Sequence, residues 1–185
     1  TVAAGAFLAM NGHNETINSL AGAGTVNNSG ASAATLTIDD GNGATFAGVI
    51  ADGSQPIAVT KAGAGTQTFS GANTYSGDTT VTLGTLKLGA ADTLPNDRVT
   101  VNGTLDLNGF SDTSGGLDGT GTVTSGSGTP VLTVGASNQG GAFSGVISGT
   151  LALTKMGSAT QELTGTVANT FTGATTINAG TLALG

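Results

Sequence analysis

The chain repeats itself at an offset of about 97 residues. Residues 72–89 read ANTYSGDTTVTLGTLKLG, and residues 168–185 read ANTFTGATTINAGTLALG, so every apolar position of the first copy stays apolar in the second. Upstream, residues 20–26 resemble residues 117–123 at the same offset. Self-similarity at a fixed spacing indicates structural units that stack on their neighbours, because one such unit cannot bury its own apolar face.

We therefore divide the chain into two similar units, 1–97 and 98–185, the second continuous with the first. The matched blocks slip by a few residues against each other. Such slips fit insertions in turns, which project from a stack of repeats and tolerate changes in length.

Each unit contains short runs in which apolar and polar residues alternate, such as those at 86–88, 99–101 and 105–107. Alternation with a period of two places the apolar side chains on one face of a β-strand. Asn-Gly pairs at 102–103 and 108–109 follow two of these runs and supply the backbone freedom of a turn. With about 20 residues per coil, the pattern predicts an all-β fold, a right-handed parallel β-helix, or β-solenoid.

Three other structures compete with this prediction. An antiparallel β-sandwich uses the same alternation and interprets each Asn-Gly pair as a hairpin turn. Disorder is the alternative for any chain so rich in glycine and poor in aromatic residues, although the β-branched runs argue against it. A helical fold is disfavoured because no segment has apolar residues at i, i+3, i+4 and i+7.

The charge of the chain excludes two classes of partner. The formal net charge is −7, and only Lys61, Lys87, Arg98 and Lys155 could meet a phosphate, so we expect neither nucleic acid nor an anionic membrane surface to bind. We also expect no membrane insertion, because no window approaches about 18 consecutive apolar residues. Cysteine is absent, which removes disulfides and thiolate ligands from consideration.

The two ends of the chain are in phase with the repeat. Residues 1–12 resemble residues 100–109 with a slip of two residues, and Gly185 is the counterpart of Gly89. We see no polar capping segment of the kind that a soluble solenoid needs at its ends. The expected partners are therefore neighbouring solenoid repeats of a longer array or copies of the same chain joined end to end.

Few residues are candidates for chemistry. The sequence Asp39-Asp40-Gly41-Asn42 loosely resembles a calcium loop, but it has no downstream glutamate ligand, and we interpret it as a solvated turn. His13 is the single histidine and is expected to fill a surface or rung position. Asp97 and Arg98 are expected to form a local surface pair or a loop feature.

Two sets of residues recur at matched positions. Lys61 and Lys155 are interpreted as isolated cations beside turns, which keep the rod soluble and hinder lateral pairing. The matched aromatic residues could stack on sugars, but we expect them to fill the core. They are Phe46, Phe69, Tyr75, Phe143 and Phe171. Sequons at Asn14, Asn27 and Asn102 are expected by chance. We assign no catalytic, cofactor-binding or metal-binding residue.

The segment 59–89 closely resembles the autotransporter-associated β-strand repeat, also called the passenger-associated transport repeat, in its pattern Lys-Xaa-Gly-Xaa-Gly-Thr followed by Asn-Thr-Tyr and Gly-Thr-Leu-Xaa-Leu-Gly. The segment 153–185 is similar but replaces the paired glycines with Gly157-Ser158-Ala159 and adds residues before Ala168. The resemblance implies a passenger of a Gram-negative surface or secreted protein, in which such repeats form a β-helical stalk.

These observations together predict a structural protein and no enzyme. The leading interpretation is a stalk or passenger segment at the outer-membrane surface or outside a Gram-negative cell. A self-assembling extracellular fibre and an adhesin that binds surface glycans through its loops are the alternatives. A carbohydrate-active enzyme is disfavoured because such enzymes on β-helices gather several acidic or basic side chains on one face.

Overall fold

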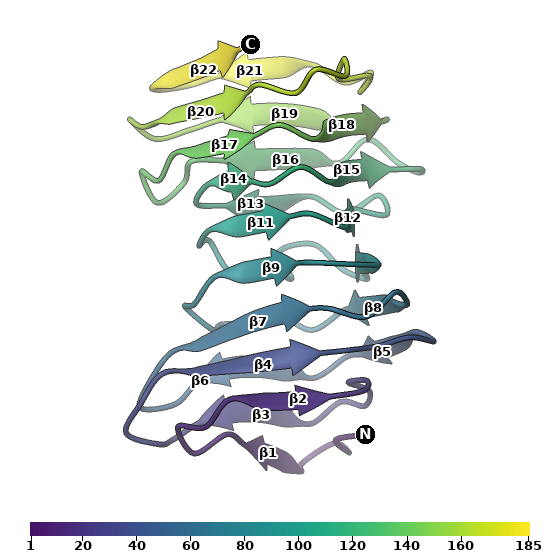
Figure 1. The fold of residues 1–185 in the computed structure, drawn as a ribbon, viewed down its shortest axis with the longest axis vertical. Helices are drawn as coiled ribbons and strands as arrows, with labels where there is room; N and C mark the ends of the chain where they lie inside the picture. The colour runs from purple at the N-terminus through teal and green to yellow at the C-terminus, as the bar shows by residue number, and fades with distance from the viewer.

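The computed structural model describes residues 1–185 and consists of strands and turns, without a helix. Every strand pair is parallel, which confirms the predicted β-solenoid and excludes the antiparallel sandwich. Stacked strands lie about 21 residues apart in the sequence, and the chain makes about eight turns. In Figure 1 the chain rises from the N-terminus at the bottom to the C-terminus at the top. The strands in front run from left to right and those behind run from right to left, so the coil is right-handed.

Each coil contributes strands to three faces of the rod (Figure 1). Face one is the front of Figure 1, where sheet pairing and the Gly119–Phe143 bridge connect nine strands in one stack. Its strands are β2 (Glu15–Ile17), β4 (Ala34–Ile38), β7 (Ile57–Lys61), β9 (Thr79–Val81), β11 (Val99–Val101), β14 (Leu117–Asp118), β17 (Gly141–Phe143), β20 (Thr160–Leu163) and β22 (Thr181–Leu184).

The other two faces are built in the same way. Face two contains β5 (Ala44–Phe46), β8 (Thr66–Phe69), β10 (Thr85–Leu88), β12 (Thr104–Asp106), β15 (Thr122–Ser125) and β18 (Val146–Gly149), and Gly22 extends it below Phe46. Face three contains β1 (Phe7–Ala9), β3 (Thr25–Asn28), β6 (Val49–Asp52), β13 (Asp112–Ser114), β16 (Val131–Val134), β19 (Ala152–Lys155) and β21 (Thr175–Ile177). Between β6 and β13 this face is continued by Thr74, which bridges Ala51, and by Asp92, whose N–H bonds the Ser111 carbonyl.

The two sequence units are rotated against each other by one face. Strand β7 lies on face one, while its counterpart β19 lies on face three. Likewise, β10 lies on face two and its counterpart β22 on face one. A unit of about 97 residues in coils of about 21 covers about 4.6 turns, so the next unit begins one face out of step.

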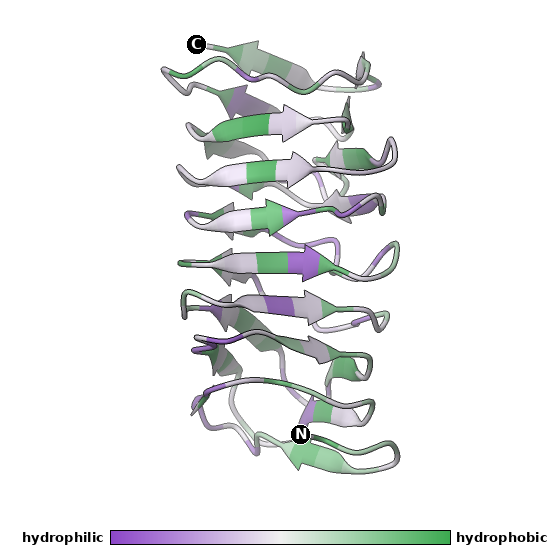
Figure 2. Cartoon of the chain, turned by 90° about the vertical axis from the view of Figure 1, so that its right-hand side faces the viewer, coloured by the Kyte–Doolittle hydropathy of each residue, from purple (hydrophilic) through white to green (hydrophobic).

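Apolar side chains point into the rod and stack in columns along its axis. In β4 and β7, buried and half-buried residues alternate along the strand, as the period-two pattern predicts. Registered neighbours such as Leu86, Leu105 and Val123 are all buried. Figure 2 shows these hydrophobic stretches of successive strands lying above one another. One continuous core of 29 buried apolar residues therefore runs through the stack.

Asparagine and glycine make the turn that the sequence predicts at 108–109. Asn108 and Gly109 both have positive φ angles, 50° and 87°. Asn11 and Gly12, their counterparts in the first unit, have φ angles of 52° and 80°. This left-handed backbone is sterically disfavoured for most residues and is adopted most readily by glycine and asparagine, so the two units turn in the same way for the same chemical reason.

Glycines form columns at the corners between faces, where the main chains of successive coils touch. A Cβ atom on Gly48 would collide with the carbonyl oxygen of Gly24, and one on Gly71 would collide with that of Gly48. In the second unit, Gly145 and Gly121 have the same relation. A side chain at these positions would push two coils apart and break their pairing.

We predict that Gly48→Ala lowers the free energy of unfolding by about 1 to 3 kcal/mol, because the added methyl group has no space against the coil below. Gly126→Ala is the matched control, since a Cβ atom on Gly126 would have no neighbouring atom within 4 Å. Chemical denaturation followed by circular dichroism measures both. Equal stability of the two variants would contradict the proposed corner packing.

Candidate functional site

The interior of the rod contains polar side chains, and two of them are lysines. Lys61, in β7, is only 1% exposed. Its Nζ atom donates hydrogen bonds to the carbonyl oxygens of Asp40 (3.4 Å), Gly63 and Leu83 (3.5 Å). These three carbonyls follow β4, β7 and β9, so they belong to three successive coils of face one. A single ammonium group thus joins three turns of the solenoid.

Lys155 takes a similar position in the second unit but joins two coils instead of three. Its Nζ atom donates to the carbonyls of Met156, Gly157 (2.9 Å) and Ala179 (3.4 Å), and the residue is fully buried. Burial lowers the pKa of both lysines, and the charges of Asp40 and Asp39 oppose this shift at Lys61.

The prediction that Lys61 and Lys155 are solubilising surface cations was therefore wrong. The glycine-rich turns after β7 and β19 leave carbonyl groups inside the rod that no backbone N–H satisfies. A buried carbonyl without a donor is costly, and the lysine ammonium supplies several donors at once. The recurrence of lysine before each glycine turn was the sequence signal for this role.

Two glutamines connect coils that are not adjacent. The side-chain amide of Gln67, in β8, donates to the Leu20 carbonyl at 2.9 Å, and its oxygen accepts the Leu20 N–H at 3.3 Å. Gln161 makes the same pair of bonds with Leu117, at 2.7 and 3.0 Å. The partners lie 47 and 44 residues apart, about two coils. Each glutamine therefore reaches past one intervening coil.

Two asparagine side chains form hydrogen bonds to the backbone of adjacent coils. Asn73 accepts the Ile50 N–H at 2.8 Å from the coil below and donates to the Thr93 carbonyl at 2.7 Å in the coil above. Asn169 accepts the Ile147 N–H at 2.7 Å in the same way.

One buried carboxylate was not singled out from the sequence. Asp112, in β13, is 3% exposed, and its oxygens accept the N–H groups of Thr93, Leu94 and Thr113 at 2.7 to 3.1 Å. Burial raises the pKa of Asp112 to about 6, although these hydrogen bonds oppose the shift. The sequence signal for this burial was the position of Asp112 in a short polar strand, where Asp112 and Ser114 point inward and Thr113 points outward.

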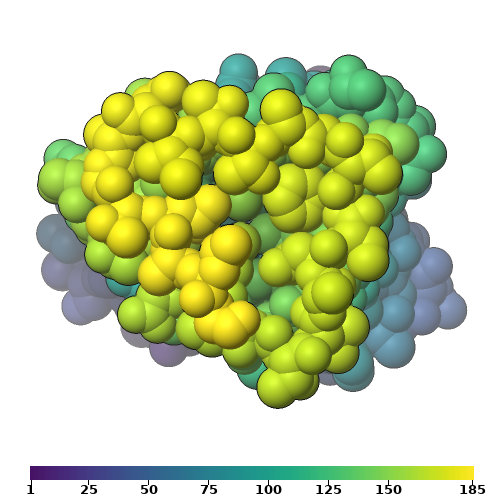
Figure 3. Space-filling view, turned by 90° about the horizontal axis from the view of Figure 1, so that it is seen from above, coloured from purple at the N-terminus to yellow at the C-terminus, as the bar shows by residue number.

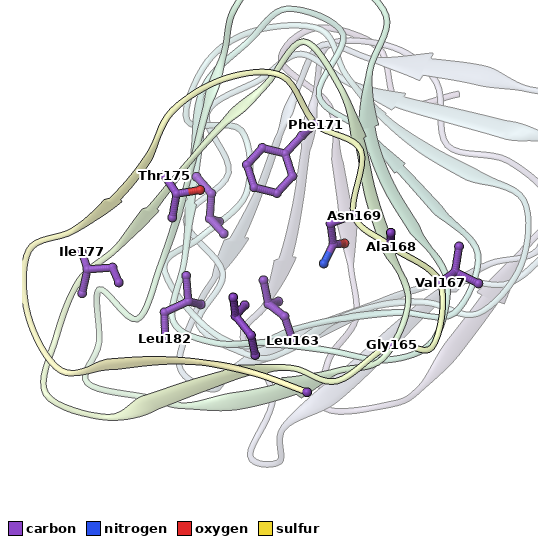
Figure 4. A pocket seen from close by; sticks show the side chains of 12 residues that line it. Leu163, Gly165, Val167, Ala168, Asn169, Phe171, Thr175, Ile177 and Leu182 are labelled. Carbon is purple, nitrogen blue, oxygen red and sulfur yellow. The ribbon is translucent and has the colours of Figure 1, made fainter.

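The C-terminal end of the rod is hollow. Seen from above, the last coil forms a ring with a depression at its centre (Figure 3). The cavity has a volume of about 510 Å³ and is lined mainly by apolar side chains. Leu163, Phe171 and Leu182 point into this space, and Asn169 lies at its edge (Figure 4). The cavity is the exposed top of the hydrophobic core.

The acidic candidate at 39–42 forms a turn, as predicted, but not a fully solvated one. Asp40 is 2% exposed, and its Oδ1 atom accepts the N–H groups of Asn42 (2.8 Å) and Gly43 (2.7 Å). Its Oδ2 atom is buried without a hydrogen-bond partner. Nowhere in the chain are three or more His, Cys, Asp or Glu side chains placed to hold a metal ion.

The remaining polar candidates lie on the surface. His13 is exposed, as expected. The Arg98 guanidinium pairs with Asp118 of the next coil, so it forms no ion pair with Asp97. The two neighbours form a loop contact instead, in which the Arg98 backbone N–H donates to Asp97 Oδ1 at 2.9 Å, and Asp97 also accepts the side-chain amide of Gln139 at 2.7 Å. The ion pair between coils could not be foreseen without knowing the register of β11 and β14.

The recurring aromatic residues fill the core, as predicted. Phe46, Phe69 and Phe143 are fully buried, and Tyr75 is 1% exposed. The Tyr75 hydroxyl lies 2.7 Å from the Thr79 hydroxyl, and burial raises the pKa of the phenol. Phe171, the counterpart of Tyr75, is half-buried and lines the end cavity.

We predict that Lys61→Met destabilises the protein by about 1 to 3 kcal/mol, because it leaves the Gly63 and Leu83 carbonyls without a donor, whereas the Asp40 carbonyl keeps the Gly65 N–H. Lys87→Met is the control, since Lys87 is half-exposed and its ion pair with Asp106 spans 3.7 Å. That change is expected to cost under about 1 kcal/mol. Urea denaturation of both variants tests the difference, and a neutral Lys61→Met would show that the ammonium group is dispensable.

Asp112 should make stability depend on pH. Its folded pKa of about 6 lies above the ordinary aspartate value of 3.8, so its contribution is most favourable below about pH 4 and is lost as the pH rises through 6. The expected loss is about 3 kcal/mol. The readout is the unfolding free energy of the wild type minus that of Asp112→Asn, measured between pH 4 and 7.5. A difference that grows with rising pH would contradict the assignment.

Comparisons with known proteins identify the repeat. The family model described as passenger-associated-transport-repeat matches residues 59–88 and 153–184, about a third of the chain. No curated protein and no solved structure matches the chain. No helix is long and apolar enough to span a membrane. The matched segments run from β7 to β10 and from β19 to β22. They include the two buried lysines, the two buried glutamines, Asn73 and Asn169. The chain therefore carries two passenger-associated-transport-repeats, one in each unit of its β-solenoid.

Proposed function

We propose that this chain is a rigid stalk segment of an autotransporter-type passenger, located at the outer-membrane surface or outside a Gram-negative cell. The main support is the role of the polar positions within the two repeats. Lys61, Gln67 and Asn73 all direct their side chains into the rod, where they form hydrogen bonds to other coils. These polar residues of the repeat thus serve cohesion between coils, which is what a load-bearing rod requires.

The way in which the rod is assembled also supports this proposal. Each coil contacts only its near neighbours, so the stack can grow one coil at a time from any point where folding begins. A passenger that crosses a membrane unfolded could therefore fold progressively on the far side. The chain has no cysteine, so this folding needs no disulfide formation.

A surface-display experiment tests the proposal. Residues 1–185 are placed between an N-terminal epitope tag and an outer-membrane translocator in a Gram-negative host. We expect antibody to label the tag on intact cells, and added protease to release the tag while leaving the solenoid whole, because its backbone is held in parallel ladders.

A Gly/Ser chain of equal length is the matched control, which added protease should degrade once it reaches the surface. The stalk function would be refuted if the tag stayed inside the cell. It would also be refuted if the solenoid were digested as fast as the control.

A further inference from the structure

Four Asn-Gly pairs lie in turns and bends of the rod, at residues 11–12, 42–43, 102–103 and 108–109. In three of them the glycine has a positive φ angle, which is 80° at Gly12, 101° at Gly43 and 87° at Gly109. Residues with a side chain rarely adopt this backbone conformation, so these turns need glycine. The turns therefore place asparagine directly before the residue that protects it least from chemical change.

Asparagine before glycine is open to deamidation, because glycine has no side chain to hinder its own nitrogen. The glycine nitrogen loses its proton and attacks the carbonyl carbon of the asparagine side chain. A C–N bond forms, ammonia leaves, and the product is a succinimide ring. Water then opens the ring to give aspartate or isoaspartate, and isoaspartate carries an extra carbon atom in the main chain. The first step needs a free glycine N–H, and the whole reaction consumes only water.

In the folded rod each of the four glycine N–H groups donates a hydrogen bond of ordinary length to a fixed oxygen atom. The acceptors are Asn28 Oδ1 for Gly12 (2.7 Å), Asp40 Oδ1 for Gly43 (2.7 Å), the Val81 carbonyl for Gly103 (2.9 Å) and Ser125 Oγ for Gly109 (3.0 Å). The three residues that accept through their side chains are all buried, so water competes little for these bonds. A bonded N–H keeps its proton and its direction, which opposes the attack.

Two of these acceptors are counterparts in the two units. Gly12 corresponds to Gly109 and Asn28 corresponds to Ser125, each at an offset of 97 residues. An amide oxygen accepts the N–H in the first unit, and a hydroxyl oxygen accepts it in the second. The two units differ in the residue but share the bond, so the common property of this position is an acceptor for the glycine N–H.

We propose that the Asn-Gly pairs are latent deamidation sites, which the folded rod keeps unreactive by accepting the glycine N–H at each of them. Three of the four acceptors lie in an adjacent coil, since β1 pairs with β3, β9 with β11 and β12 with β15. Separating two coils therefore opens a site. The asparagines themselves are exposed or half-buried, so water reaches them.

This inference goes beyond the stalk function and does not rest on it. Isoaspartate would lengthen the main chain of a turn that has to match the next coil, and aspartate would add a negative charge to a chain whose net charge is −7. The hydrogen bonds between coils thus extend the chemical lifetime of the rod as well as holding it together.

Comparison of the folded and the unfolded chain tests the protection. Peptide mass spectrometry measures deamidation at each pair after incubation in mildly alkaline buffer, with and without guanidinium chloride. We expect each pair to react at least about tenfold more slowly in the folded chain, because reaction at a closed site follows the small population of opened molecules.

Removal of one acceptor tests the mechanism. Ser125→Ala takes away the acceptor of the Gly109 N–H, so Asn108 should deamidate about threefold to tenfold faster, while the other three pairs keep their rates. Ser148→Ala is the matched control. It removes a half-buried hydroxyl from the next coil, where Ser148 bonds the Thr124 hydroxyl at 3.1 Å, and it should change the rate at none of the four pairs.

A second pair of variants separates the acceptor from the stability of the fold. Asn28→Ser and Asn28→Ala both lose the amide donors to the Ser32 and Pro56 carbonyls, but only serine keeps an oxygen for the Gly12 N–H. Asn11 should therefore deamidate faster in the alanine variant than in the serine variant. Circular dichroism confirms that each variant is folded.

Three results would overturn the proposal. They are equal rates in the folded and unfolded wild type, an unchanged rate at Asn108 in Ser125→Ala, and equal rates at Asn11 in the two Asn28 variants. Uniform acceleration of all four pairs in Ser125→Ala would also count against it, because it would reflect general loosening of the fold. A rod that deamidates while folded but passes the surface-display experiment would leave the stalk function standing.

Discussion

Parallel main-chain pairing between successive coils is the interaction on which the rest of this structure depends. A single coil of about 21 residues has few apolar side chains and a large entropy to lose on ordering. Apart from a few turn hydrogen bonds within a coil, its amides and carbonyls find their backbone partners in the coils above and below. Stability therefore comes from contacts between neighbouring coils. At the corners the main chains of successive coils meet only where no side chain separates them, which is why Gly24, Gly48 and Gly71 stack there.

The buried polar residues follow from the same constraint. Where the chain turns sharply through glycines, ladder pairing is interrupted and carbonyl groups face inward. Lys61 and Lys155 satisfy those groups, and Gln67 and Gln161 satisfy the Leu20 and Leu117 backbones. Buried cations are tolerated when several oxygen atoms surround them. Cohesion along the rod thus comes from polar side chains as well as from the apolar columns.

Much of the fold could be predicted from the sequence. The alternation at 86–88 and 105–107 indicates strands, the repeat indicates stacking, and the buried aromatic positions follow from both. The polar interior could not be predicted, because a lysine beside a glycine turn is usually exposed and only the three-dimensional path shows that the Gly63 and Leu83 carbonyls meet around Lys61 without a backbone donor. The ion pair between Arg98 and Asp118 could not be predicted for a similar reason, since the two residues are adjacent only across the coils.

The one-face rotation between units has a consequence for any longer array of them. Equivalent side chains of consecutive units project from the rod in three directions in turn, and the fourth unit faces the same way as the first. Loops or binding groups carried once per unit would wind around the axis as a spiral. Such a rod presents its decorations to all sides and has no preferred direction of bending.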